Sequence, residues 1–199
     1  MSNNENMNEN PSETKILMAE TLKKLIKDRP FSKITIQDIV AECNINRNTF
    51  YYHFENNYDL LYFAYEQEVQ NIVTSFRNAN ATIPQALDFI LDYIDKNISL
   101  CMCAYESLGE QQLKTIFEKD LQDFVRATIE YFSTHNGVTF SQDFQSFASF
   151  SYTNLLSTQI IWYIRHNSNL DKKIFKDSLQ TFFLASLKAV LEEATKKGM

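Results

Sequence analysis

Glycine, proline and cysteine are scarce in this sequence, with three of each among 199 residues. Hairpins, β-sandwiches and phosphate-binding loops need glycine or proline for their tight turns, so this shortage argues against all of them. The alternation of apolar and polar residues that is typical of β-strands is missing as well. We therefore expect an all-helical protein.

The cysteines also bear on the cellular compartment. Cys43, Cys101 and Cys103 are odd in number, no signal-peptide pattern precedes them, and their spacing does not match a disulfide framework. A reducing cytoplasm is the expected location. No apolar run approaches the roughly 20 residues that span a bilayer, so we expect no membrane association.

Motifs that are typical of enzymes are absent from the sequence. It has no glycine-rich phosphate loop, no nucleophile elbow and no paired histidines on one helix. Cys101 and Cys103 lie far from His135 and His166, which does not match a closed tetrahedral metal site, and buried cysteines are the better interpretation. We expect no catalytic residue, no metal and no cofactor.

An excess of basic residues is missing too. The net charge is −6, and residues 1–60 hold seven Lys or Arg against nine Asp or Glu. Proteins that bind nucleic acid usually carry a basic surface. Any contact with DNA must therefore come from a local patch.

Hydrophobic residues, by contrast, make up 44% of the chain and aromatic residues 14%, which is enough for a well-packed core. Their periodicity predicts about nine helices. Residues 1–11, rich in Asn and Glu, are predicted to form a disordered arm. Residues 12–55 are expected to form a compact domain of three helices, and residues 56–199 a second helical domain.

A sharp turn is expected between the second and third helices of the first domain. Thr35 is placed to cap the second helix, which is apolar on one face. Asn44 follows that helix, where a left-handed residue is needed, and Asn46 is placed to cap the third helix. Phe50 and Phe54 are expected to point from the third helix into the core. This arrangement is typical of a helix-turn-helix unit.

The segment from Thr35 to Phe54, which ends in Thr-Phe-Tyr-Tyr-His-Phe and is followed by Asp59-Leu-Leu61, resembles the helix-turn-helix of the TetR family. The resemblance covers residues 14–63. It implies an all-helical homodimer that binds a palindromic operator in double-stranded DNA and represses or activates transcription. It also implies that the second domain binds a small-molecule effector, which controls the affinity for DNA.

The expected DNA contacts lie on the third helix and just before the second. A recognition helix presents its N-terminal residues to the base edges, which favours Arg47 and Asn48 for direct readout. The family often has a phosphate-binding lysine at the position of Asn57, and its replacement predicts weaker electrostatic binding. Core packing is the alternative interpretation of Tyr51 and Tyr52, and a solvated loop charge is the alternative interpretation of Lys33. The candidates for phosphate contacts are Lys33, Thr35, Thr49, Tyr51, Tyr52 and His53.

Aromatic side chains of the second domain are candidates for an effector pocket, although plain core packing competes for each of them. The alternative function is a regulator whose second domain docks a protein partner. A ligand-sized cavity would favour the effector, and a filled core with an exposed apolar patch beyond the dimer surface would favour the partner. The candidates are Tyr93, Tyr105, Phe117, Tyr131, Phe147 and Trp162, with Tyr152 and Tyr163 as further members.

The last two helices are apolar around most of their circumference. They cover residues 141–167 and the stretch from Phe175 to Leu191. One chain of this size cannot bury both helices on every side. We expect a four-helix interface between two copies of the chain. The residues expected to meet their symmetry mates are Leu155, Trp162, Phe183 and Leu187.

Overall fold

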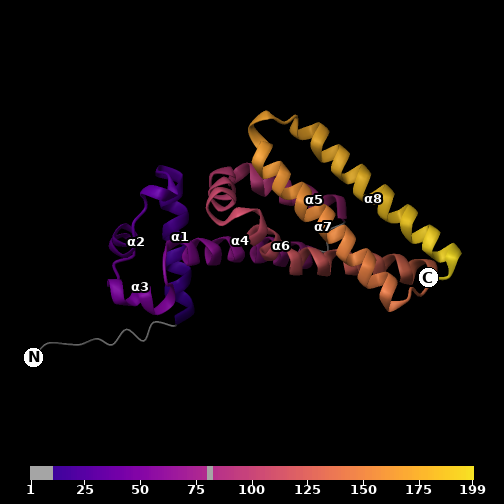
Figure 1. Cartoon of the computed structure of the whole chain (residues 1–199), viewed down its shortest axis with the longest axis horizontal. Coiled ribbons are helices and arrows are strands. Elements are labelled where there is room, and N and C mark those ends of the chain that lie inside the picture. The colour runs from indigo at the N-terminus through magenta and orange to yellow at the C-terminus, as the bar shows by residue number, and fades with distance from the viewer. Residues whose placement is uncertain (1–10, 80–82) are drawn as a thin grey trace, which may run out of the picture. The chain divides into compact units, whose positions relative to one another are not determined.

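The computed structural model describes residues 11–79 and 83–199 (Figure 1). All regular structure in these two stretches is helical, which confirms the predicted fold class. None of the described helices is both long and apolar enough to cross a membrane. The predicted arm lies outside the described residues as far as Asn10, and the first helix begins at Pro11.

By compactness the chain divides into two units, Met1–Glu68 and Val69–Met199. The division falls inside the fourth helix, later in the chain than the boundary predicted between residues 55 and 56. The elements of the first unit are α1 (Pro11–Asp28), the 3-10 helix η1 (Phe31–Lys33), α2 (Ile36–Glu42), α3 (Arg47–His53) and the first half of α4 (Asn57–Ala79).

The first unit is built around side chains that its helices withdraw from water. Each of these helices carries an apolar stripe, and burial of such stripes is the main favourable contribution to folding. Because α1, α2, α3 and α4 all contribute to one core, the orientation of α3 is set by packing. The residues at the centre of this core are Met18, Leu22, Ile39, Phe50, Leu60 and Leu61.

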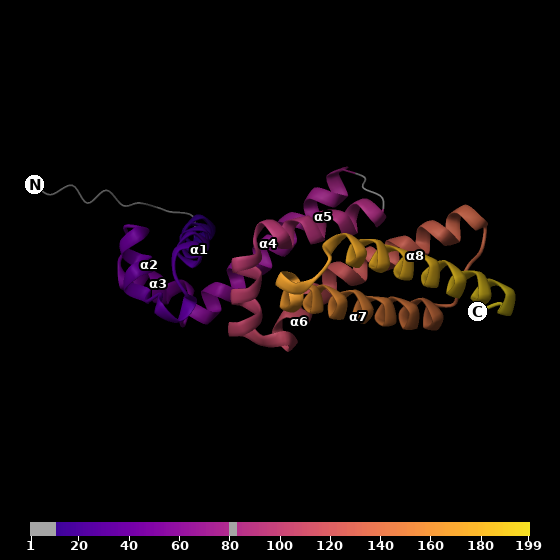
Figure 2. The same ribbon diagram turned by 90° about the horizontal axis from the view of Figure 1, so that it is seen from above.

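The second unit continues with helices only, and α7 and α8 run antiparallel beside each other in both views (Figure 1, Figure 2). Ser141 and Asp171 accept backbone hydrogen bonds at the starts of these two helices. The elements are the second half of α4, α5 (Ile83–Lys96), α6 (Ile98–Asn136), α7 (Gln142–His166), the 3-10 helix η2 (Asn167–Asn169) and α8 (Lys172–Lys197).

The long helix α6 is interrupted at Gly109. This residue has φ 82° and ψ 166°, a conformation that glycine adopts far more readily than other residues. Residues 100–108, predicted as a short helix or bent connector, form the helical part before the break. A second helical part follows it and ends at Gly137, again with positive φ. With the two parts of α6 counted separately, the described residues hold nine α-helical segments, in agreement with the prediction.

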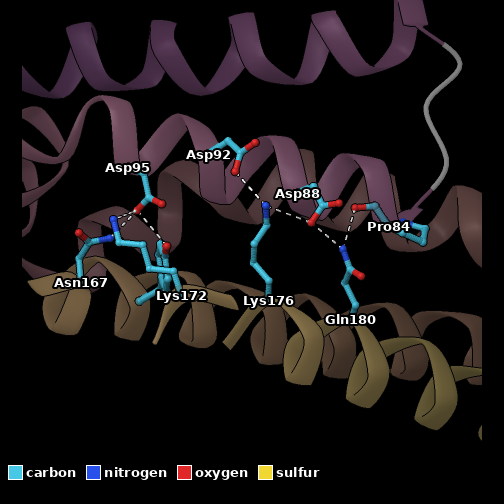
Figure 3. Close-up of polar contacts among 9 residues, drawn as sticks. Pro84, Asp88, Asp92, Asp95, Asn167, Lys172, Lys176 and Gln180 are labelled. Atoms are coloured by element: carbon cyan, nitrogen blue, oxygen red, sulfur yellow. Dashed lines mark hydrogen bonds and ion pairs between the residues drawn. The ribbon is translucent and has the colours of Figure 1, made fainter. Parts of the chain in front are cut away.

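A row of polar contacts joins α5 to α8 (Figure 3). Lys176 Nζ lies 2.8 Å from Asp92 Oδ1 and 3.3 Å from Asp88 Oδ1. Gln180 Nε2 donates to Asp88 Oδ1 at 2.7 Å. The carboxylates of Asp88, Asp92 and Asp95 share one face of α5, because residues three and four apart are neighbours on a helix.

Asp95 accepts hydrogen bonds from three donors at the other end of this row. Its Oδ1 lies 2.7 Å from Asn167 Nδ2, 2.9 Å from Lys172 Nζ and 2.9 Å from the hydroxyl of Tyr163. Tyr163 is fully buried, and a buried tyrosine needs a partner for its hydroxyl. Partial burial alone would raise the pKa of Asp95, but the bonds from Lys172, Asn167 and Tyr163 hold it below its ordinary value.

The cysteines are buried and free, as predicted. Burial raises the pKa of Cys103 to about 11, which keeps the thiol protonated and unreactive. Cys43 Sγ lies 3.2 Å from Thr21 Oγ1 inside the first unit. Among the described residues, no group of three or more His, Cys, Asp or Glu side chains is arranged to hold a metal ion.

Candidate nucleic-acid interface

Helix α2 begins with a reciprocal cap. The Asp38 N–H donates to Thr35 Oγ1 at 3.2 Å, and the Thr35 N–H donates to Asp38 Oδ2 at 2.8 Å. The Thr35 hydroxyl also donates to Asp38 Oδ2 at 2.7 Å, and these bonds lower the pKa of Asp38. A phosphate contact by this hydroxyl, as predicted, would have to compete with Asp38.

The turn from α2 to α3 has the predicted form. Asn44 adopts the left-handed conformation with φ 53°, and it is the one non-glycine residue with positive φ in the described part of the chain. Asn46 Oδ1 accepts the N–H of Thr49 at 2.8 Å and so caps α3. The expectations for Asn44 and Asn46 are confirmed, and these two residues set the angle between the helices.

Helix α3 has one face in the core and one in solvent. Phe50 and Phe54 are buried, as predicted. Tyr51 and Tyr52 are 47% and 77% exposed, so core packing does not account for them. An N-terminal turn with arginine and asparagine in solvent is suited to the base edges of the major groove. The exposed residues of α3 are Arg47, Asn48, Tyr51 and Tyr52.

Arg47 is held along the surface of α3 by Tyr51. Its Nη2 donates to the Tyr51 hydroxyl at 3.1 Å, and its guanidinium lies 5.5 Å from the centroid of the same ring. The two residues are four apart and therefore share a helix face. A cation–π contact at an exposed site contributes about 0.5–1 kcal/mol. The guanidinium is thus presented in a defined position at the start of α3.

Thr49 and His53 are only partly exposed. The His53 ring packs edge-on against Tyr52 with 4.9 Å between centroids. Partial burial, together with the charge of Lys15, lowers the pKa of His53, which favours the neutral imidazole over the charged one. Lys15 on α1 lies 5.7 Å from the centroid of Phe54. Sequence reasoning missed this basic residue beside α3, because no local pattern connects α1 with the third helix.

Part of the positive charge of the first unit is paired with nearby carboxylates. Lys24 Nζ lies 2.5 Å from Glu42 Oε1, and Arg29 Nη2 lies 3.2 Å from Asp38 Oδ1. Such pairs reduce the positive field that DNA experiences. Lys33 is exposed at the end of η1, where it was predicted to contact phosphate. These ion pairs reduce the positive charge that the first unit presents to solvent.

The residues predicted to line an effector pocket do not share one environment. Phe117 is buried, whereas Tyr93 and Tyr105 are half-buried. Tyr131 and Phe147 are among the most exposed large side chains of the chain. In the single chain these last two face solvent, so they do not line an interior pocket.

A groove of about 480 Å³ lies between α7 and α8. Among the predicted pocket residues, Trp162 contributes to its wall. The Trp162 ring stacks on Phe175 with 5.6 Å between centroids. The walls are mainly apolar, with a few hydroxyl and amide groups. The lining residues are Thr158, Gln159, Trp162, Phe175, Ser178, Leu179 and Phe182.

The exposed apolar side chains of α7 and α8 differ in part from those predicted for the dimer. Phe183 and Leu187 are 0% and 3% exposed in the single chain, and Phe183 packs against Tyr152. These two residues therefore face the chain's own core. Successive positions on a helix point about 100° apart, so the adjacent Phe182 faces solvent. Leu155 is half-buried. The large exposed apolar residues of the two helices are Phe147, Phe150, Trp162, Ile174, Phe182 and Val190.

Comparison with known proteins finds a family match within the first unit and relatives that cover more of the chain. The family described as "Bacterial regulatory proteins, tetR family" matches residues 20–62. An HTH-type transcriptional regulator of Staphylococcus aureus (strain USA300) is 25% identical over 128 residues, which are 59% of this chain and 68% of that protein.

Solved structures extend the similarity to most of the chain. The dihydroxyacetone kinase operon activator DhaS matches with a TM-score of 0.63 and 20% identity, covering 88% of this chain and 97% of that one. A proposed TetR-family transcriptional regulator from Syntrophomonas wolfei matches with a TM-score of 0.63 and 17% identity, covering 89% and 96%. At these identities the likeness shows the fold alone.

The family match and the structure agree on the first unit. The matched residues include α2, the Asn44 turn, α3 and the start of α4, which together form the helix-turn-helix described above. The relatives found by sequence are helix-turn-helix regulators of transcription. Residues 20–62 therefore form the helix-turn-helix of the tetR family of bacterial regulatory proteins, and the chain has the fold of the TetR-family transcriptional regulators to which it is similar.

Proposed function

We propose that this chain binds a palindromic operator as a homodimer, and that a small-molecule effector in the second unit controls its affinity for DNA. The observation that carries the proposal is the capped helix α3, which Phe50 anchors in the core and which exposes Arg47 and Asn48. Arginine pairs well with guanine and asparagine with adenine in the major groove. The exposed hydroxyls of Tyr51 and Tyr52 are suited to phosphate oxygens.

Helices α7 and α8 supply the proposed dimer interface. No charged residue occurs in the stretches Phe147–Ile164 and Ser178–Leu187. Interface centres are depleted of charge and enriched in aromatic residues, and Phe150 and Phe182 are both exposed here. Two such surfaces related by a two-fold axis would form a four-helix bundle. Phe182 and Val190 take the places that Phe183 and Leu187 had in the sequence-based proposal.

The groove between α7 and α8 supports an effector site. Trp162 and Phe175 provide apolar surface, and Thr158 and Gln159 provide a few polar groups, which is the usual make-up of a small-molecule site. The groove lies on the proposed dimer surface, so the partner would cover it. An effector held there would contact both copies of the chain and could change the separation of their recognition helices.

A second candidate is a regulator whose second unit docks a protein partner. Tyr131 favours it, because this residue of α6 is 65% exposed, packs against His135 and lies outside α7 and α8. Exposed apolar surface beyond the dimer interface marks sites of protein interaction. A cell extract divided by ultrafiltration separates the two functions. A change in operator affinity caused by the small-molecule fraction supports the effector, and one caused only by the macromolecular fraction supports the partner.

Enrichment of duplexes from a random-sequence library tests the operator binding itself. The Arg47→Ala variant should lose about 1–3 kcal/mol of discrimination between the enriched duplex and random DNA, because a bidentate arginine contact is lost. Arg126→Ala, at an exposed position of α6, is the matched control and should bind as the unaltered protein does. A protein that enriches no sequence would contradict the proposal. Equal loss on both DNAs would remove Arg47 from base readout.

A further inference from the structure

Two consecutive residues at the start of α4 contact the segment that leads into α2. Asn57 Nδ2 donates to the Ile34 carbonyl at 2.7 Å. The ring of Tyr58 meets the ring of Phe31 edge-on, with 5.2 Å between centroids. Phe31 is the first residue of η1, and the buried Ile34 directly follows that helix. The start of α4 therefore contacts both ends of the turn that precedes α2.

Local hydrogen bonds fix the position of Asn57 itself. Asn56 Oδ1 accepts the backbone N–H of Tyr58 at 2.8 Å and that of Asp59 at 3.1 Å. Asp59 Oδ2 accepts the N–H of Glu55 at 3.1 Å. These bonds satisfy donors that the first turn of a helix leaves unpaired. The amide of Asn57 is thus carried on a well-ordered helix start.

We infer that Asn57 is a positioning residue for operator binding, whose amide sets the angle between α4 and the α2–α3 pair without touching DNA. The Ile34 carbonyl lies one residue before Thr35, the cap of α2, and the Asn44 turn connects α2 to α3. Loss of the Asn57 bond would therefore release the segment that leads through Thr35 and α2 to the recognition helix.

The chemistry of the asparagine supports this role. Its Oδ1 is buried and has no hydrogen-bond partner in the part of the chain that the structure describes. The amide therefore points into the protein, where its Nδ2 donates to the Ile34 carbonyl, and not outward to a phosphate. An uncharged side chain also adds nothing to the attraction of the DNA backbone. The inference deepens the operator binding proposed above and rests on it.

The variant Asn57→Leu tests this role, because leucine has a similar volume but no donor and leaves the Ile34 carbonyl unpaired. Affinity for the duplex that the unaltered protein enriches should fall about fivefold, the equivalent of one neutral hydrogen bond. Affinity for random DNA and the slope of log affinity against log salt should not change. Gln70→Leu, the same kind of change at an exposed position of α4, should leave all three quantities unaltered.

Two results would overturn the inference. Equal loss on both duplexes would mean that Asn57 contacts a phosphate directly, because a phosphate contact carries no base information. If folded Asn57→Leu, measured below its Tm, binds the enriched duplex as tightly as the unaltered protein does, the residue contributes to stability alone. If Asn57→Leu does not fold, Tyr58→Leu must show the same selective loss, because it removes the contact with Phe31 from an exposed position. Failure of the unaltered protein to enrich any duplex would instead contradict the operator binding.

Discussion

Phe182 and Phe183 are neighbours on α8, and their replacement should have different consequences. In the single chain Phe182 is 60% exposed and Phe183 is 0% exposed. Full burial of a phenylalanine is worth about 1.5–3 kcal/mol, so covering the exposed part of Phe182 contributes about 0.9–1.8 kcal/mol. A two-fold interface contains this contact twice. Phe182→Ala should therefore weaken dimerisation by about 20- to 400-fold and leave the fold of each chain intact.

Phe183→Ala should act on stability instead, because it leaves a cavity in the core. Such a change costs about 3–5 kcal/mol, which lowers the Tm of a chain of this size by about 6–20 °C. Sedimentation equilibrium measures the dimer constant, and thermal unfolding measures the Tm. Phe89→Ala, at an exposed position of α5, is the control and should change the dimer constant by less than about twofold. An unchanged dimer constant for Phe182→Ala would refute the α8 interface.

Three further outcomes are expected. Tyr52→Phe should weaken binding to enriched and random DNA alike, because a phosphate contact carries no base information; loss on the enriched duplex alone would contradict this. The salt dependence of operator binding should correspond to about four to six phosphates per dimer, and a much steeper slope would reveal a missed basic surface. Asp95→Asn should flatten the acid dependence of the Tm. Because the pKa of Asp95 is lower in the folded chain than in the unfolded chain, where it is about 3.9, ionised Asp95 stabilises the fold at pH values above about 3.9. This stabilisation is lost as the pH falls through the folded-state pKa.

The helix-turn-helix could be predicted from the sequence because its signals are local. Asn44 and Asn46 mark a turn and a cap within three residues, and the buried Phe50 and Phe54 lie within α3 and directly after its last residue. Each of these features depends on the neighbouring residues and not on the rest of the fold. The exposure of Tyr51 needed the structure, since an aromatic residue packs equally well in a core.

The second unit could be predicted only in outline. Helices α7 and α8 are apolar on most sides, so periodicity cannot say which side meets the chain's own core, and Phe183 was placed on the outside for this reason. The bond from Asn57 to Ile34 and the pairing of Lys176 with Asp92 connect residues 23 and 84 positions apart. Contacts of this kind depend on the packing of helices, which local sequence patterns do not encode.

The symmetry of the enriched DNA tests the central claim most directly. If α3 reads bases and α7 and α8 form a two-fold dimer, the enriched duplex must contain two inverted half-sites. Their centres should lie one helical turn, about 10 base pairs, or a multiple of it apart. Hydroxyl-radical footprinting should then show two protected patches at the same spacing on one face of the DNA. A single asymmetric site, bound by one chain with full affinity, would contradict the account.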